Sequence, residues 1–347
     1  MPHRNIPIFI PHLGCPNQCV FCNQRSISGC REFCEGDVEH QIDQALQTIP
    51  TGAETEIAFF GGSFTGIDRE LMLRLLDTAE RYVRAGRVTS VRLSTRPDYI
   101  DAEILAILSR YSVRVIELGL QSMDDTVLRK TKRGHTAKQA RDACRAVKDA
   151  GFALVGQMMI GLPESTAESE LAAAQEIVAL GADAARIYPT VVFYGTPLCD
   201  MTQNGEYTPL SVTEAVRRSA AVLRVFEKAN VPCIRIGLCA TEELVSPEAV
   251  MAGPNHPALG ELVWNEYCYQ EILNALERAS LRGGEVLLRV PERAVSKVVG
   301  QRRCNIERLL RETDTRVCKT VGEKQLREVI AESWQPVRKQ EEEQPCI

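Results

Sequence analysis

Short apolar segments alternate with segments in which apolar residues recur every three or four positions along the first two thirds of the chain. The first pattern is typical of strands buried on both faces, and the second of amphipathic helices. Asp37 and Ser211 stand where N-caps are expected, before the first and last of these helices. We expect strands at 5–12, 55–62, 88–95, 113–120, 152–163 and 184–192, and helices at 37–49, 68–85, 101–111, 123–130, 137–150, 167–181 and 211–230.

Six strand-then-helix units in series predict an α/β fold with a parallel sheet and right-handed crossovers. Both an open doubly wound sheet and a complete or partial barrel fit such a series. In either case the site lies at the carboxyl ends of the strands. Residues that are uncommon at the ends of plain buried strands follow these carboxyl ends: a cysteine-rich loop, Gly61–Gly62, Thr95–Arg96, Gln121 and Pro163.

The last third of the chain has a different pattern. After a core at 1–232, residues 233–283 are expected to extend the barrel with a short strand and a long helix from about Glu261 to Arg278. Residues 284–330 predict a small basic α/β domain. The polar, charged segment 331–347 is expected to be a disordered tail.

Composition excludes few functions. Of 347 residues, 44% are apolar and 25% charged, which is the balance of an ordinary soluble protein. The net charge of −5 does not by itself indicate binding to nucleic acid or membranes. No apolar run approaches the roughly 20 residues of a membrane span, so we expect a cytoplasmic protein with no membrane partner.

Three cysteines, Cys15, Cys19 and Cys22, form a C-x3-C-x2-C pattern after the first expected strand. A structural zinc ion usually takes four ligands, which Cys30 or Cys34 would have to complete. Thiolates are also the natural ligands of a [4Fe–4S] cluster. Three of them leave one iron without a protein ligand, and that iron can bind a substrate or cofactor directly.

The spacing, with the aromatic Phe21 before the last cysteine, resembles the signature of the radical S-adenosylmethionine (SAM) superfamily. The resemblance implies a partial (β/α)6 barrel, a [4Fe–4S] cluster held by the three cysteines, and SAM bound at the open iron. It also implies reductive cleavage of SAM to a 5′-deoxyadenosyl radical, with an electron donor such as flavodoxin or ferredoxin as a partner.

The same resemblance assigns SAM contacts to residues near the ends of later strands. An acid such as Glu117 within a buried strand is costly unless it is paired, and an ion pair with a neighbouring arginine is the alternative to a ligand contact. Ser63 stands where the family has an acid, so its contact is expected through the backbone. The expected SAM-binding residues are Gly61, Gly62, Ser63, Thr95, Glu117, Gln121, Ile160 and Tyr188.

A closer resemblance covers roughly residues 10–265. The segments STRPDY, ELGLQSMDD, KRGHT, QMMIGLP, RIYPTVVFYGTPL and NHPALGELV, in this order, resemble the radical SAM half of the catalytic subunit of Elongator, which modifies the wobble uridine of tRNA. Arg133, Gly134 and His135 match its RGHT segment. This implies RNA, in particular tRNA, as the substrate. The residues after 265 show no Gly-rich acetyl-CoA signature, so we do not carry over the acetyltransferase chemistry.

Residues 290–310 resemble the helix–Gly-x-x-x–helix core of a KH domain, which clamps a nucleic-acid backbone. Between 289 and 327, eleven cations and five acids give a local charge of +6, and no aromatic residue occurs. We expect Lys297, Arg302 and Arg303 to bind RNA; a solvated charged surface is the alternative. If this domain does not bind RNA, a small molecule such as a porphyrinogen-like metabolite is the alternative substrate.

Overall fold

A computed structural model of the chain describes residues 3–11, 13–15, 19–23, 33–50, 52–238 and 249–334. The chain divides into two compact units, a first unit of residues Met1–Gly260 and a second unit of residues Glu261–Ile347. The first unit contains all the expected strand-then-helix repeats, and the second contains the basic α/β segment.

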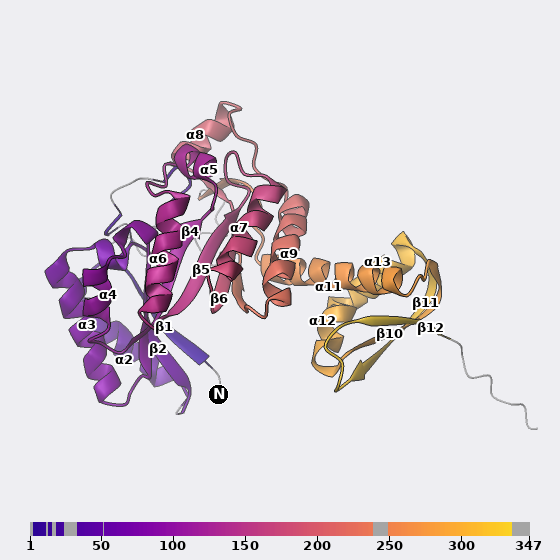
Figure 1. The fold of residues 1–347 in the computed structure, drawn as a ribbon, viewed down its shortest axis with the longest axis horizontal. Coiled ribbons are helices and arrows are strands. Elements are labelled where there is room, and N and C mark those ends of the chain that lie inside the picture. Colours follow the sequence, from indigo (N-terminus) through magenta and orange to yellow (C-terminus); the bar gives the residue numbers. More distant parts are fainter. Residues whose placement is uncertain are drawn as a thin grey trace, which may run out of the picture. The chain divides into compact units, whose positions relative to one another are not determined.

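The first unit is built on a parallel sheet of seven strands whose spatial order follows the chain without reversal. This order is that of a curled half-barrel and not of a doubly wound sheet, so the predicted partial barrel is confirmed (Figure 1). All six expected strands form, and β8, from the segment predicted as an extension, joins as a seventh. The strands are β1 (His3–Phe9), β2 (Glu54–Phe60), β3 (Ser90–Thr95), β4 (Val113–Gln121), β5 (Ala153–Ile160), β6 (Ala184–Pro189) and β8 (Cys233–Ile236).

The expected helices also form, with ends within a few residues of those predicted. The sequence did not reveal α8 (Pro197–Gln203) or the antiparallel ribbon of β7 (Val192–Phe193) and β9 (Val250–Ala252). None of the helices in the described residues is both long and apolar enough to cross a membrane. The helices predicted correctly are α2 (Val38–Thr48), α3 (Arg69–Arg84), α4 (Ala102–Leu108), α5 (Asp125–Lys130), α6 (Ala137–Asp149), α7 (Ala167–Ala179) and α9 (Val212–Lys228).

The two expected helix caps differ in outcome. The Ser211 hydroxyl accepts a hydrogen bond from the Glu214 amide at 3.2 Å, so this N-cap is confirmed. Asp37 occupies the N-cap position of α2, but its side chain makes no capping bond. The reason is that the 3-10 turn η1 (Glu35–Asp37) leads directly into α2 and leaves Asp37 with helical backbone angles.

The two faces of the barrel sheet have opposite chemistry. The helix-covered face is apolar and tightly packed, since a Cβ on Gly156 would lie 2.5 Å from Cγ2 of Ile177 on α7. The other face carries buried charges, because the strand register turns Glu117, Gln157 and Arg186 to the side opposite Gly156. The strands are therefore buried on both faces as predicted, but one face is polar.

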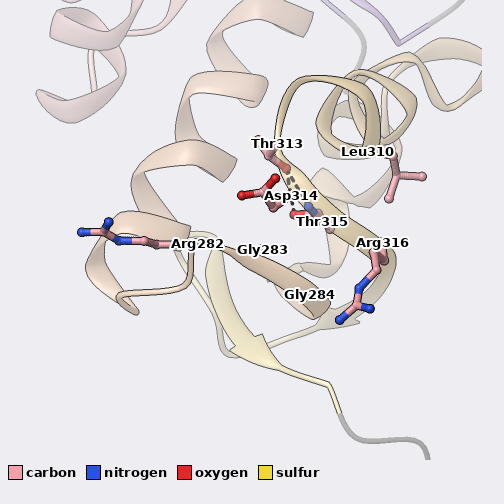
Figure 2. A pocket seen from close by; sticks show the side chains of 8 residues that line it. All are labelled: Arg282, Gly283, Gly284, Leu310, Thr313, Asp314, Thr315 and Arg316. Carbon is pink, nitrogen blue, oxygen red and sulfur yellow. Dashed lines mark hydrogen bonds between the residues drawn. The ribbon is translucent and has the colours of Figure 1, made fainter.

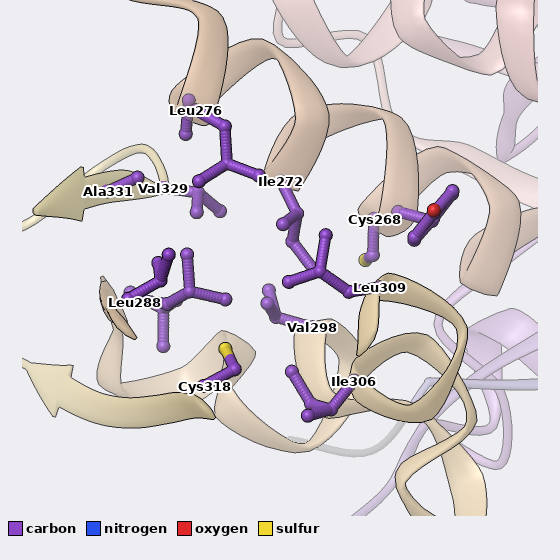
Figure 3. Packing of buried hydrophobic residues seen from close by; sticks show 14 residues of the cluster. Cys268, Ile272, Leu276, Leu288, Val298, Ile306, Leu309, Cys318, Val329 and Ala331 are labelled. Atoms are coloured by element: carbon purple, nitrogen blue, oxygen red, sulfur yellow. The ribbon is translucent and has the colours of Figure 1, made fainter. Parts of the chain in front are cut away.

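The second unit packs two short helices and a long one around a three-stranded sheet. Its strands have the order β11-β10-β12, with β10 parallel to β11 and antiparallel to β12. Apolar side chains from α11 face those of the sheet and of α13 (Figure 3). The elements are α11 (Leu259–Arg278), β10 (Gly283–Pro291), α12 (Val295–Val299), α13 (Cys304–Glu312), β11 (Asp314–Glu323) and β12 (Ile330–Ser333).

The strand–helix–helix–strand order expected around residues 290–310 is present in the second unit. Its likeness to a KH domain stays a prediction. Residues 331–333, which the sequence assigned to a disordered tail, belong to β12 because they pair with β10. Residues 335–347 of that tail lie outside the described residues.

We expect Leu309→Ala to destabilise the protein by about 2–5 kcal/mol, because Leu309 is fully buried in the core of the second unit and its truncation leaves a cavity. Urea unfolding measures the change. The neighbouring Leu310 is 38% exposed on the same helix, so Leu310→Ala is the matched control and should cost less than about 1 kcal/mol. Equal costs for the two variants would contradict this packing of α13.

Candidate active site

The cysteine loop that follows β1 packs against the turn that follows β2. The Ser63 amide donates a hydrogen bond to the Leu13 carbonyl at 3.0 Å, and Cys15 Sγ lies 3.4 Å from Ser63 Oγ. A Cβ on Gly62 would lie 2.2 Å from the Leu13 oxygen, and one on Gly14 2.2 Å from the Ser63 oxygen. Both positions therefore need glycine, and the turn that the family resemblance assigns to SAM also holds the cysteine loop in place.

The second half of the loop is held from two other sides. The Val20 amide donates to the Thr131 carbonyl at 3.1 Å, and the Val20 carbonyl accepts from the Leu198 amide at 2.9 Å. The Cys22 amide donates to the Cys19 carbonyl at 3.1 Å, which closes a tight turn. Cys19, Val20 and Phe21 are buried in an apolar cluster with Val127, Leu162 and Leu198. The segment from Cys19 to Cys22 is thus held by backbone hydrogen bonds, and Cys19 lies in an apolar setting.

Two buried arginines lie beside the cysteines. Arg133 donates from Nη1 to Cys19 Sγ at 3.4 Å and from Nη2 to the Gly119 carbonyl at 2.7 Å. Arg96 is 1% exposed and binds both oxygens of Asp98, at 2.9 and 2.8 Å. Burial lowers the pKa of Arg96, but Asp98, Cys19 and Cys15 raise it by more, so this guanidinium stays charged.

Each of these arginines keeps one buried nitrogen without a hydrogen-bond partner in the described residues, Nη1 of Arg96 and Nε of Arg133. Buried donors are nearly always satisfied. Two unsatisfied cationic donors near Cys15 and Cys19 indicate a place for a bound group that carries negative charge.

Gln121 and Gly119 complete this region at the end of β4. Gln121 adopts a left-handed backbone conformation with φ of 65°, and its Oε1 is buried without a partner in the described residues. A Cβ on Gly119 would lie 2.7 Å from Nη2 of Arg133, so glycine leaves the room that the guanidinium occupies. The ELGLQ segment therefore shapes the site in two ways: Gly119 has no side chain and leaves room for Arg133, and Gln121 has a left-handed backbone.

His135 is buried close to the same arginines. Its imidazole is 4% exposed, and its Nδ1 lies 4.0 Å from Oδ1 of Asp98. Burial first, and then the charge of Arg133, lowers the pKa of His135 to about 3. The imidazole is therefore neutral at physiological pH.

The remaining residues expected at the SAM site lie in several environments. Thr95 Oγ1 is 2.7 Å from Thr65 Oγ1, and the carbonyl of fully buried Ile160 accepts two bonds from Thr190, both of 2.8 Å. Tyr188 lies on the polar sheet face, with its hydroxyl 3.5 Å from Arg186. Their assignment to SAM stays a prediction.

Glu117 forms the ion pairs that the sequence left open as an alternative. Arg92 donates to its Oε1 at 2.9 Å, and Nε of Arg186 lies 2.7 Å from its Oε2. Arg92 also binds Glu56, so two carboxylates and two guanidiniums form one buried network. A ligand contact of Glu117 would have to be made alongside these pairs.

The donor set fits an iron–sulfur cluster. Cys15, Cys19 and Cys22 are free thiols. The chemistry of three thiolates suits a [4Fe–4S] cluster, because each thiolate binds a different iron. Among the described residues, no group of three His, Cys, Asp or Glu side chains is placed to hold a metal ion. Of the two cysteines that a zinc site would add, Cys34 is exposed, and Cys30 lies outside the described residues.

Comparison with known proteins identifies the family. Residues 9–177 match the radical SAM superfamily, and residues 182–268 match the radical SAM C-terminal domain. The chain belongs to the radical SAM superfamily. The family resemblance predicted from the cysteine motif is thus confirmed, and the protein is a radical SAM enzyme by family.

The radical SAM relatives include Elongator proteins. Elongator complex protein 3 of mouse and of human is 28% identical over 204 residues, which cover 53% of this chain and 37% of the relative. An uncharacterized protein of Methanocaldococcus jannaschii is 29% identical over 226 residues, covering 61% of this chain and 68% of that protein. The chain thus spans little more than a third of the length of its Elongator relatives.

Solved structures support the radical SAM fold. The archaeal Methanocaldococcus infernus Elp3 superimposes with a TM-score of 0.58 and 22% identity, over 81% of this chain and 64% of that chain. Methylornithine synthase has a TM-score of 0.50 and 16% identity, over 74% of this chain and 76% of that chain. At these identities the likeness concerns the fold alone.

Sequence reasoning missed several partners of the site residues. It did not identify Asp98, which binds Arg96 from two residues away, or the role of Arg133 as a donor to Cys19. Arg92 and Arg186 were also missed. Their signal was visible, because an arginine within an otherwise apolar strand is as costly as Glu117 in its strand and predicts a partner.

We expect His135 to make the protein less stable as the pH falls from about 7.5 to about 5. The unfolded chain protonates this imidazole near pH 6.5 and the folded chain only near pH 3, so acid favours unfolding. At pH 5 the effect is about 2 kcal/mol. His135→Gln should flatten the pH dependence by this amount in urea unfolding, whereas the same change at exposed His40 should not. Parallel pH profiles for His135→Gln and the wild type would contradict the burial of His135.

Proposed function

We propose that this radical SAM enzyme modifies RNA, with tRNA as its substrate. The observation that carries the proposal is the match to Elongator complex protein 3, which is 28% identical over 204 residues and covers 53% of this chain. The substrate follows from the resemblance to the Elongator catalytic subunit, and the basic segment 289–327 of the second unit supports it.

The cofactors of the proposed reaction are a [4Fe–4S] cluster and SAM. Cys15, Cys19 and Cys22 would hold the cluster, and the buried cations Arg96 and Arg133 suit its negative charge together with that of a SAM carboxylate. When bound, cluster and SAM supply a one-electron cleavage of the sulfonium that yields a 5′-deoxyadenosyl radical able to abstract hydrogen.

The protein's own residues orient and shield this chemistry. Arg133 holds a hydrogen bond to Cys19, which would stabilise the thiolate form of that ligand. The apolar side chains of Val20, Phe21 and Leu162 keep water from the loop. For SAM we propose backbone contacts at Gly61, Gly62 and Ser63 and side-chain or packing contacts at Thr95, Glu117, Gln121, Ile160 and Tyr188.

A further partner and a cellular location follow from the same proposal. The cluster needs an external electron, so we propose a small reductant such as flavodoxin or ferredoxin. The cytoplasmic location expected from the sequence stays a prediction that agrees with a tRNA substrate.

We expect anaerobically reconstituted protein to release 5′-deoxyadenosine when it is given dithionite and SAM. When bulk tRNA is added, we expect the enzyme to consume SAM and to change a nucleoside of the tRNA. Cys19→Ala should abolish the release, because it removes one of the three thiolates that would hold the cluster. Liquid chromatography with mass spectrometry of the products and of digested tRNA measures both results.

The matched control for this experiment is Cys304→Ala. Cys304 is an exposed free cysteine of the second unit, and its loss should leave the release of 5′-deoxyadenosine unchanged. Release that persists in Cys19→Ala would contradict the cluster assignment. Release with no change to any RNA nucleoside would contradict the RNA substrate and favour a small molecule such as a porphyrinogen-like metabolite.

A further inference from the structure

The cations of the second unit fall into two groups. The first group is paired with acids, as in Arg289 with Glu332 at 2.9 Å and Arg308 with Glu312 at 2.9 Å. The second group is exposed and has no carboxylate partner among the described residues. On α12 and the loop that leads to α13, it comprises Lys297, Arg302 and Arg303. Three uncompensated positive charges on one short segment are suited to phosphate groups.

The loop that carries these arginines has a fixed shape. Gly300 is buried with φ of 78°, and a Cβ there would lie 2.5 Å from Cys304 Sγ. Asn305 is 3% exposed and donates from Nδ2 to the Val298 carbonyl at 3.1 Å, which ties the end of α12 to the start of α13. Arg302 and Arg303 both adopt left-handed backbone conformations. A loop that is already ordered loses little entropy when it binds.

The structure also places an aromatic side chain beside this basic segment. Lys297 Nζ lies over the Trp264 ring, 4.2 Å from its centroid, and Tyr267 meets Trp264 edge-on at 5.5 Å. Trp264 belongs to α11, 33 positions before Lys297 in the sequence. Base stacking on an aromatic face beside a basic track is how proteins bind single-stranded nucleic acids. The sequence window 289–327, which contains no aromatic residue, gave no sign of it.

We propose that Trp264, Lys297, Arg302 and Arg303 form a binding surface for an unpaired segment of RNA, in which Trp264 stacks on a base and the cations bind the backbone. Duplex RNA is recognised mainly through its shape, phosphates and 2′-hydroxyls, and offers no open base to an aromatic ring. This surface rests on the proposed function for the choice of RNA as the ligand. It adds that the second unit binds the RNA, and that the bound segment is unpaired.

The fluorescence of Trp264 tests the surface directly, because the chain has only two tryptophans, Trp264 and Trp334. In full-length Trp334→Phe protein, an unstructured RNA of about 12 nucleotides should quench the emission, since a stacked base quenches tryptophan. In the matched Trp264→Phe protein, only Trp334 emits. Trp334 lies under Lys319 at 4.0 Å in a similar cation–aromatic pair, and its emission should not change.

A binding titration with labelled RNA tests the cations. Arg302→Gln with Arg303→Gln should weaken binding by about tenfold and make the slope of log affinity against log salt smaller by about 1.4, or 0.7 for each lost phosphate contact. The matched control is Arg282→Gln with Arg316→Gln. These two arginines line an open cleft of about 590 Å³ at the opposite end of α13 (Figure 2), and their loss should change the affinity by less than about threefold.

Each outcome bears on one of the two proposals. Quenching of Trp334 in place of Trp264, equal losses in the two arginine pairs, or equally tight binding of a perfect RNA duplex would overturn the surface. If the full enzyme modifies tRNA, but RNA does not quench Trp264 and loss of Arg302 and Arg303 does not weaken binding, the proposed function stands and this surface does not. If the surface binds unpaired RNA but no RNA nucleoside changes in turnover, the surface stands and the RNA substrate does not.

Discussion

The candidate site depends on one close backbone contact that only glycine permits. The loop carrying Cys15 and the turn after β2 approach so closely that side chains at Gly14 and Gly62 would each overlap a carbonyl oxygen. This contact aligns the Leu13 carbonyl with the Ser63 amide and brings Cys15 beside the Ser63 hydroxyl. Without it, three thiols on an irregular loop would have no fixed relation to the strand ends that complete the site.

Buried charges are arranged differently on the polar sheet face and next to the cysteines. On the polar sheet face, Glu56 and Glu117 are paired with Arg92 and Arg186 in one buried network. Next to the cysteines, Arg96 and Arg133 are compensated only in part, by Asp98 and by a carbonyl and a thiol. Buried cations of this kind are stable when an anionic group completes them.

The same logic separates the two units by function. In the described part of the first unit, Arg96 and Arg133 keep unsatisfied donors inside, where a small anionic cofactor would be shielded from water. Among its described residues, the second unit exposes cations without a carboxylate partner at Lys297 on α12 and at Arg302 and Arg303 on the loop that Gly300 and Asn305 hold in place. An inward site suits chemistry with a radical, and an outward basic surface suits a large substrate that must present one residue at a time.

Periodicity was enough to predict the strands and most helices, because buried parallel strands and amphipathic helices leave strong local patterns. It left an open doubly wound sheet and a barrel both possible, and only the family resemblance of the cysteine motif favoured the partial barrel. The cysteine motif was enough to predict the family. Contacts between distant segments could not be predicted locally. Examples are the identity of the arginines that pair with Glu117, the hydrogen bond of Arg133 to Cys19, and Trp264 beside Lys297, each of which depends on how the chain folds back.

The central claim is that three thiolates hold a four-iron cluster and leave one iron open to SAM. Electron paramagnetic resonance of the dithionite-reduced, reconstituted protein, with iron counted in the same sample, tests it most directly. The account predicts about four irons per chain and a cluster spectrum that changes when SAM is added. Zinc in place of iron, or a cluster spectrum that SAM leaves unchanged, would contradict it.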